Sequence, residues 1–299
     1  MARPALAATR AVEVLGYLAA HPTESFTLTE LSQRLDINRA SLHAVLGTLE
    51  EAGYLARHPV HRTYGLGPAV IALGHAALER HRALDYARDE MRSLAALLDL
   101  EVLATVRVGT DMLAVGRAGP HQPAPSTLRV GQRVPLVPPL GPVFLAYAEA
   151  TAVDQWLVAG GLDPAGPEAK RYRGILQTVR RRGFSVALRQ EAQSQLGQVM
   201  ASLARNPRDV SLHTRLQHWL AELEQADYQL ADLEPGARYD VTLVGAPVFD
   251  ARGDVALALW ALGFQQPLDG TALARCAERV RGAALRVTHA THGRVPDPN

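Results

Sequence analysis

Apolar residues recur at helical spacing in three short stretches near the start of the chain. Residues 9–20, 27–35 and 39–52 each place their apolar side chains three and four positions apart, which predicts three helices with one buried face each. The stripe of the third consists of Leu42, Val45, Leu46 and Leu49. His21-Pro22 is expected to end the first helix, because proline disfavours helical geometry in the residue before it.

The signals at the helix starts join the second and third helices into one motif. Thr27 and Glu30 have the spacing of a capping box, and Asn38 is a favourable N-cap for the third helix. Only residues 36–38 separate the two, as in a helix-turn-helix, whose second helix lies in the major groove of DNA. The polar face of that helix then presents Arg39, Ala40, Ser41, His43 and Ala44.

A β-hairpin is expected directly after this helix. Gly53 is suited to end the helix, and the β-prone residues 54–57 and 63–66 flank a polar tip. In such a wing, Arg57 and Arg62 are placed to contact phosphate or the minor groove. The alternative is a small helical domain used for protein contacts. A wing at this distance favours DNA.

The remaining pattern predicts a mixed domain. Gly67-Pro68 begins a helix with apolar residues up to Leu78, and residues 83–98 form another, expected to bury Leu84, Ala87, Met91, Leu94 and Leu97. Hairpins are expected at residues 101–117 and 239–262, and helices near 142–149, 152–158, 167–182 and 270–288. This order is typical of an α/β (α+β) fold in which helices pack around a sheet.

Composition narrows the class of protein further. The chain has 299 residues, of which 47% are hydrophobic, and this suits two domains. Its single cysteine, Cys276, excludes an internal disulfide framework or a Cys-based zinc site. Without a secretory signal or an apolar run of roughly 18 residues, we expect a bacterial cytoplasmic protein, nucleoid-associated when bound to DNA.

Charge does not support DNA binding by itself. The net charge is +1, and the six arginines of residues 1–67 are matched by six carboxylates. The DNA prediction therefore depends on where the arginines lie.

Enzymatic motifs are missing as well. His58 and His61 are the closest pair among eleven histidines, with no carboxylate or cysteine at ligand spacing, and no HExxH, phosphate-binding loop or nucleophile elbow occurs. We expect no enzyme, no cofactor and no metal site.

Several stretches resemble the IclR family of transcriptional regulators. The N-terminal resemblance covers Thr9 to Leu73 and includes TLTELSQRLDINRASLHAVLGTLEEAGYLAR and TYGLGPAVIALG. Downstream, the family's effector domain is resembled by VGQRVPLVPPLGPVFLAYAE (residues 130–149), RRRGFSV (180–186) and GAPVFDARGDVALALWALG (245–263).

The resemblance implies a winged helix-turn-helix in residues 1–67, a linker helix in 68–82 and a GAF-like effector-binding domain in 83–299. It also implies a homodimer or homotetramer on a partly palindromic DNA operator, a small-molecule effector and no membrane partner. In the family the linker helix pairs with its symmetry mate; the alternative is a helix packed only on its own domain. Repression is the family's commoner mode, and we expect it here. The alternative function is a ligand-binding or protein-interaction module without DNA-binding activity.

Departures from the family pattern concern ligand and DNA. The residues matched to the effector pocket are Val106, Leu140, Gly141, Pro142, Val244, Gly245, Trp260 and Leu262. Pro142 replaces a polar residue of members that bind small acids, and Trp260 and Leu262 stand where serines are frequent. We therefore expect a mostly apolar or aromatic effector, the alternative being a pocket filled by its own side chains. On the reading helix, Ala44 stands where the family often has arginine.

An insertion is the last departure. The interval between Gly183 and Ala246 is roughly three times as long as in the family. Residues 189–236 are expected to include a helix at 209–228 with the stripe Leu212, Leu216, Trp219, Leu220 and Leu223. This helix would cover the pocket, contact another subunit or thicken the domain.

Overall fold

The computed structural model describes residues 5–120, 128–225 and 228–297. Its N-terminal domain contains the helices α1 (Leu6–Ala19), α2 (Leu28–Leu35) and α3 (Arg39–Glu51). The predicted capping box is confirmed: the Thr27 hydroxyl accepts a hydrogen bond from the Glu30 amide, and the Thr27 amide donates one to the Glu30 carboxylate. The predicted wing is present as β2 (Leu55–Arg57) and β3 (Thr63–Leu66).

One strand of this domain escaped the sequence analysis. β1 (Phe26–Thr27) pairs antiparallel with β3, so the wing belongs to a three-stranded sheet in the order β1-β3-β2. Phe26 lies opposite Tyr64, and both are buried. This pairing ties the start of α2 to the wing, so the reading helix and the hairpin form one packed unit.

Two consecutive helices lead into the second domain. α4 (Ala69–Arg80) has no buried residue, and its Ile71 and Leu73 are 64% and 54% exposed. α5 (Arg82–Leu98) follows after a break at His81 and buries Ala87, Met91, Leu94 and Ala95. The expectation that Leu97 is buried was wrong: it is 59% exposed, because the buried stripe passes through Ala95 and Leu98 instead.

The second domain is built on a six-stranded antiparallel sheet in the order β6-β5-β4-β10-β9-β7. β4 (Glu101–Val108), β5 (Asp111–Ala118), β9 (Val241–Phe249) and β10 (Val255–Leu262) form the two predicted hairpins. β6 (Arg133–Pro135) and β7 (Ser185–Leu188) lie at the edges, and a separate small sheet pairs β8 (Arg238–Tyr239) with β11 (Leu268–Asp269).

Helices cover both faces of the large sheet. α5 and α11 (Gly270–Ala290) pack on one face, with Val102, Val244 and Leu259 in the core between them and the strands. The other face carries α6 (Pro142–Leu145), α7 (Ala150–Ala159), α8 (Pro167–Arg182) and the insertion. α6 is shorter than predicted, because Glu149 adopts an extended conformation as the N-cap of α7.

The insertion is a helical hairpin rather than a single helix. α9 (Glu191–Arg205) was not predicted; α10 (Val210–Gln225) was, and the two pack against each other. The predicted stripe is buried at Leu212, Leu216, Leu220 and Leu223, and Trp219 is partly buried. Each such leucine contributes about 1.5–3 kcal/mol relative to an exposed one, so the hairpin is a firm part of the domain.

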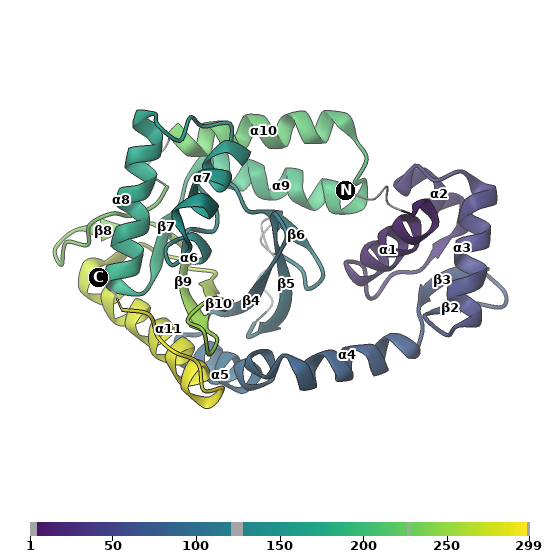
Figure 1. Cartoon of the computed structure of the whole chain (residues 1–299), viewed down its shortest axis with the longest axis horizontal. Coiled ribbons are helices and arrows are strands. Elements are labelled where there is room, and N and C mark those ends of the chain that lie inside the picture. Colours follow the sequence, from purple (N-terminus) through teal and green to yellow (C-terminus); the bar gives the residue numbers. More distant parts are fainter. Residues whose placement is uncertain (1–4, 121–127, 226–227, 298–299) are drawn as a thin grey trace.

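The arrangement of the two domains leaves the N-terminal domain at one end of the molecule (Figure 1). α4 connects it to the second domain along one side, and α9 and α10 approach it along the other. Within the described ranges, we find no helix with the length and apolar composition of a membrane span.

Candidate DNA-binding surface and ligand cavity

The polar face of α3 is open to solvent. Asn38 caps the helix through its Oδ1, which accepts a hydrogen bond from the Ser41 amide at 2.9 Å. Leu42 and Leu46 are fully buried against α1 and α2, and this fixes which side of the helix points outward. Four of the predicted contact residues are exposed and Ser41 is half-buried; the exposed ones are Arg39, Ala40, His43 and Ala44.

The wing holds its tip by local hydrogen bonds. The His58 Nδ1 accepts from the amides of Val60 (3.3 Å) and His61 (3.2 Å), and Arg62 adopts a left-handed conformation with φ of 53°. The His58 side chain therefore stabilises the turn at the wing tip. Within the described ranges no three His, Cys, Asp or Glu side chains gather in a way that could hold a metal ion.

The side chains of the two wing arginines differ in how firmly they are held. The Arg57 guanidinium stacks over the Tyr64 ring at 5.5 Å, which orients it along the sheet. Arg62 is exposed at the tip. A surface of this shape, a protruding helix beside a hairpin with arginines, is the geometry of a major-groove helix with a flanking wing.

A cavity lies between the large sheet and the insertion. Its volume is about 110 Å³, and its walls come from β4, β5, β10, the segment before α6, and α9. Most of its lining is apolar, including Leu103, Met112, Leu196, Met200 and Trp260. The described residues that line it include no charged side chain.

Five polar side chains reach this lining: Thr105, Gln132, Gln193, Tyr228 and Gln229. Some are already engaged: Trp260 donates its Nε1–H to the Thr105 hydroxyl (2.8 Å), and Gln193 accepts from Thr242. The Gln229 Nε2 donates to the Pro139 carbonyl at 3.2 Å, while its buried Oε1 has no partner among the described residues. Burial raises the pKa of Tyr228, so its hydroxyl stays protonated. The cavity is thus neutral, with a few hydroxyl and amide groups.

Comparison with known proteins identifies the N-terminal domain. The family model of the IclR helix-turn-helix domain matches residues 7–59, the segment that builds α1 to the wing. Residues 7–59 therefore form an IclR-type helix-turn-helix domain.

Two curated IclR-family relatives match different shares of the chain. The Pca regulon regulatory protein of Pseudomonas putida is 31% identical over 140 residues, which is 44% of this chain and 45% of that protein, so this alignment spans less than half of the relative. The HTH-type transcriptional regulator KipR of Bacillus subtilis is 22% identical over 265 residues, or 88% of this chain and 89% of that protein.

Solved structures of the IclR family share the whole fold. The regulator from Alicyclobacillus acidocaldarius has a TM-score of 0.67 at 24% identity and covers 97% of this chain and 100% of its own. An IclR homologue from Microbacterium hydrocarbonoxydans, solved in complex with 4-hydroxybenzoate, has a TM-score of 0.62 at 18% identity and covers 95% of this chain and 98% of its own.

The pocket residues expected from the IclR resemblance are only partly brought together. Five line the cavity: Leu140, Gly141, Pro142, Trp260 and Leu262. Gly245 lies directly beneath the Trp260 ring, where a Cβ would collide with Cε3 and Cζ3. Placing Val106 and Val244 in this set was wrong. Their side chains belong to the core on the opposite face of the sheet.

The sheet register explains this error. Trp260 lies opposite Leu103 and Gly245, and Leu262 lies opposite Leu243. Residues directly opposite in an antiparallel pair share a face, and successive residues alternate, so Val244 must face away. The cavity-facing residues of β4 are therefore Leu103 and Thr105, one position from the predicted Val106.

The wall formed by α9 is the part that the sequence analysis missed. Gln193, Leu196 and Met200 come from this helix, and Tyr228 and Gln229 from the segment after α10. The three-and-four spacing of Leu196, Val199, Met200 and Leu203 was the available signal, since it predicts one apolar face. Of the three roles considered for the insertion, covering the cavity fits the position of α9.

Proposed function

We propose that this IclR-family protein is a transcriptional repressor that binds operator DNA through α3 and the wing, and that an uncharged, mostly apolar ligand in the cavity controls this binding. The proposal of an uncharged ligand rests on one observation: the described residues that line the cavity include no charged side chain. The proposal of DNA binding rests on the exposed polar face of α3, which starts at Arg39.

The ligand class follows from the chemistry of the lining. A carboxylate placed there would lose its hydration without gaining a cation, at a cost on the order of several kcal/mol. A bound water takes about 10–15 Å³ of such a volume, so about 110 Å³ accommodates on the order of ten non-hydrogen atoms. That size suits a single substituted ring. The relative complexed with 4-hydroxybenzoate supports a ligand of this size in such a domain, but a neutral derivative suits this lining better.

Dimerisation is supported by α4. Its apolar residues Val70, Ile71 and Leu73 lack a partner within the described chain that would bury them. Pairing with the same helix of a second copy would cover them and would bring two reading helices onto successive major grooves, roughly 34 Å apart or a multiple of that.

Titration calorimetry with matched ligands tests the ligand class. We expect the methyl ester and the amide of 4-hydroxybenzoate to bind at least about ten-fold more tightly than the acid, because only the acid brings a charge into the neutral cavity. Tighter binding of the acid, of pyruvate or of glyoxylate would overturn this assignment.

A single substitution provides the control. Leu262→Lys adds a cation to the lining and is expected to shift the preference toward the acid, whereas Leu262→Met keeps the cavity neutral and is expected to leave it unchanged. If both variants keep the wild-type preference, charge in this cavity does not select the ligand.

A further inference from the structure

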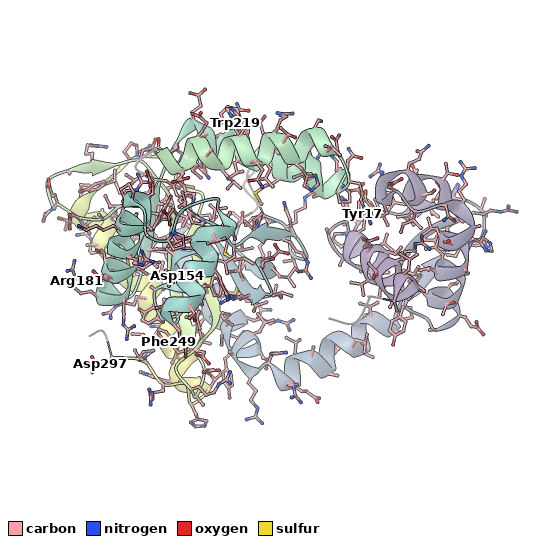
Figure 2. All side chains as sticks on the ribbon, turned by 45° about the horizontal axis from the view of Figure 1, so that its top comes forward. Tyr17, Asp154, Arg181, Trp219, Phe249 and Asp297 are labelled. Carbon is pink, nitrogen blue, oxygen red and sulfur yellow. The ribbon has the colours of Figure 1, made fainter. Side chains whose placement is uncertain are left out.

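The insertion contacts the DNA-binding domain at the end of α9. The Tyr17 hydroxyl of α1 donates a hydrogen bond to the Arg205 carbonyl at 3.2 Å, and Arg208 forms an ion pair with Glu13 at 2.6 Å. Figure 2 shows Tyr17 on the side of the DNA-binding domain that faces the ends of α9 and α10. The domain is therefore connected to the ligand-binding domain by this contact as well as by the linker helix.

Tyr17 is suited to hold this contact. Its ring is 5% exposed and belongs to the core of the DNA-binding domain, so the hydroxyl is held in place. Arg34 of α2 donates a hydrogen bond from its Nη1 to the same hydroxyl oxygen at 2.5 Å. Arg205 is the last residue of α9. Carbonyls in the last turn of a helix have no hydrogen-bond donor within that helix, so the Arg205 carbonyl can accept from the Tyr17 hydroxyl. A polarised chain of hydrogen bonds thus runs from α2 through Tyr17 to the C-terminus of α9.

The same helix forms a wall of the cavity. Leu196 and Met200 line the cavity, and Arg205 follows nine residues after Leu196, which places it about 13 Å along the helix axis. Met200 and Gln132 also line the cleft between the two domains, together with Glu13, Tyr17 and Arg208. The cavity and the interdomain contact are therefore connected by a single helix, α9.

We propose that α9 couples occupancy of the cavity to the position of the DNA-binding domain. A ligand that displaces Leu196 and Met200 moves α9 and separates the Arg205 carbonyl from the Tyr17 hydroxyl. The domain then stays attached through the linker and through the close approach of Gly131, before β6, to the Ala19 backbone, and it turns about the break at His81 between α4 and α5. This inference rests on the proposed role of the cavity as the effector site.

The contact between α9 and the DNA-binding domain is weak enough for a ligand to break. Arg208 and Glu13 are 51% and 30% exposed, so their ion pair is weak. The Tyr17 hydrogen bond shifts an equilibrium by roughly three- to ten-fold. A ligand needs only a modest difference in affinity between the two arrangements to change their populations.

Spin-label distance measurements on the full chain test the coupling without DNA or ligand. Labels are attached at the exposed positions Glu51 (on α3) and Arg215 (on α10) after substitution to cysteine, in a Cys276→Ser background and diluted with unlabelled chain. We expect a narrow distance distribution for the parent. Tyr17→Phe is expected to raise the population outside the main peak roughly five-fold. Tyr54→Phe, which alters a partly buried tyrosine of the same domain away from the contact, is the matched control and should not.

A cavity-filling substitution replaces the ligand. Ala201 lines the cavity from α9, so Ala201→Trp, or Ala201→Leu if the larger variant fails to fold, is expected to broaden the distribution as Tyr17→Phe does. Combined with Tyr17→Phe it should add almost nothing, because the same contact is already lost. Gln198→Trp, on the exposed side of α9, is the control for bulk.

The outcomes separate this inference from the proposed function. An unchanged distribution in Tyr17→Phe, no effect of filling the cavity, or equal broadening with and without the Tyr17 hydroxyl would each overturn the coupling. Because neither operator nor effector is present in this experiment, failure of the repressor proposal shows only in the DNA and calorimetric measurements.

Discussion

Arg39 and Arg62 differ in what they offer to DNA. Arg39 is the first residue of the reading helix, where base contacts concentrate, and Arg62 projects from the wing tip, where phosphates pass. We expect Arg39→Ala to reduce the preference for operator over random DNA by about 1–3 kcal/mol if it reads a guanine. Arg62→Ala should weaken both DNAs alike and reduce the slope of log K against log salt by about 0.9.

Fluorescence anisotropy on both DNAs over a salt series measures the two effects. Equal losses on operator and random DNA for Arg39→Ala would contradict its role as a base-reading residue. Arg129→Ala, a basic residue of the ligand-binding domain, is the control for a general loss of positive charge.

Single residues also mark the limit of sequence-based prediction. The exposed face of α3 follows from its periodicity, and the structure agrees at Arg39, His43 and Ala44. Val106 and Val244 were placed on the wrong face, because a shift of one residue moves a strand side chain to the other side of the sheet. Only the register of Trp260 against Leu103 and Gly245 decides this, and register is a property of the paired strands.

At the scale of elements, the start of α2 depends on its capping box. The Glu30 carboxylate accepts hydrogen bonds from the Thr27 amide (2.7 Å) and hydroxyl (2.8 Å). We expect Thr27→Ala to lower the free energy of unfolding by about 0.5–2 kcal/mol in urea titrations. Thr48→Ala, an exposed change within α3, should stay within about 0.5 kcal/mol. Equal effects of the two substitutions would mean that the box does not stabilise the domain.

The same box predicts a dependence on pH. Hydrogen bonds from the Thr27 backbone and side chain lower the pKa of Glu30 from its ordinary value of 4.5. Its contribution to stability is therefore present above pH 4.5 and is lost as the pH falls through the lowered folded-state pKa. The stability difference between wild type and Glu30→Gln should shrink over that range; a difference that stays constant down to pH 2 would contradict this.

The insertion shows which part of an element is predictable. α10 was expected from its leucine stripe, whereas α9 was not predicted although it carries a similar stripe at Leu196, Val199, Met200 and Leu203. Local periodicity predicts that such a face is buried. What it is buried against, here a cavity wall and the sheet, depends on packing between segments far apart in sequence and could not be read from the stripe.

At the scale of the whole molecule, the exposed face of α4 needs a partner. We expect Ile71→Glu to weaken self-association by roughly ten- to a hundred-fold, because it removes the burial of one large aliphatic side chain, about 1.5–3 kcal/mol. Sedimentation equilibrium measures this. Val210→Glu, on α10 and 78% exposed, is the matched control. If both variants associate like the wild type, α4 is not the dimer contact.

Dimerisation matters for DNA because the charge of one domain is small. The six arginines of residues 1–67 are balanced in number by six carboxylates, so the attraction of a single domain to the phosphate backbone is weak. Two domains held on successive grooves add their contacts through a high effective concentration. Pairing of the linker helices is therefore expected to strengthen binding of the reading helices to DNA.

The most direct test is a mobility-shift titration with DNA from upstream of the protein's own gene, against random competitor at varied salt. We expect binding at least about a thousand-fold tighter than to random DNA, and release by a neutral single-ring ligand but not by its carboxylic acid. Equal affinity for both DNAs, or release by the acid alone, would contradict it.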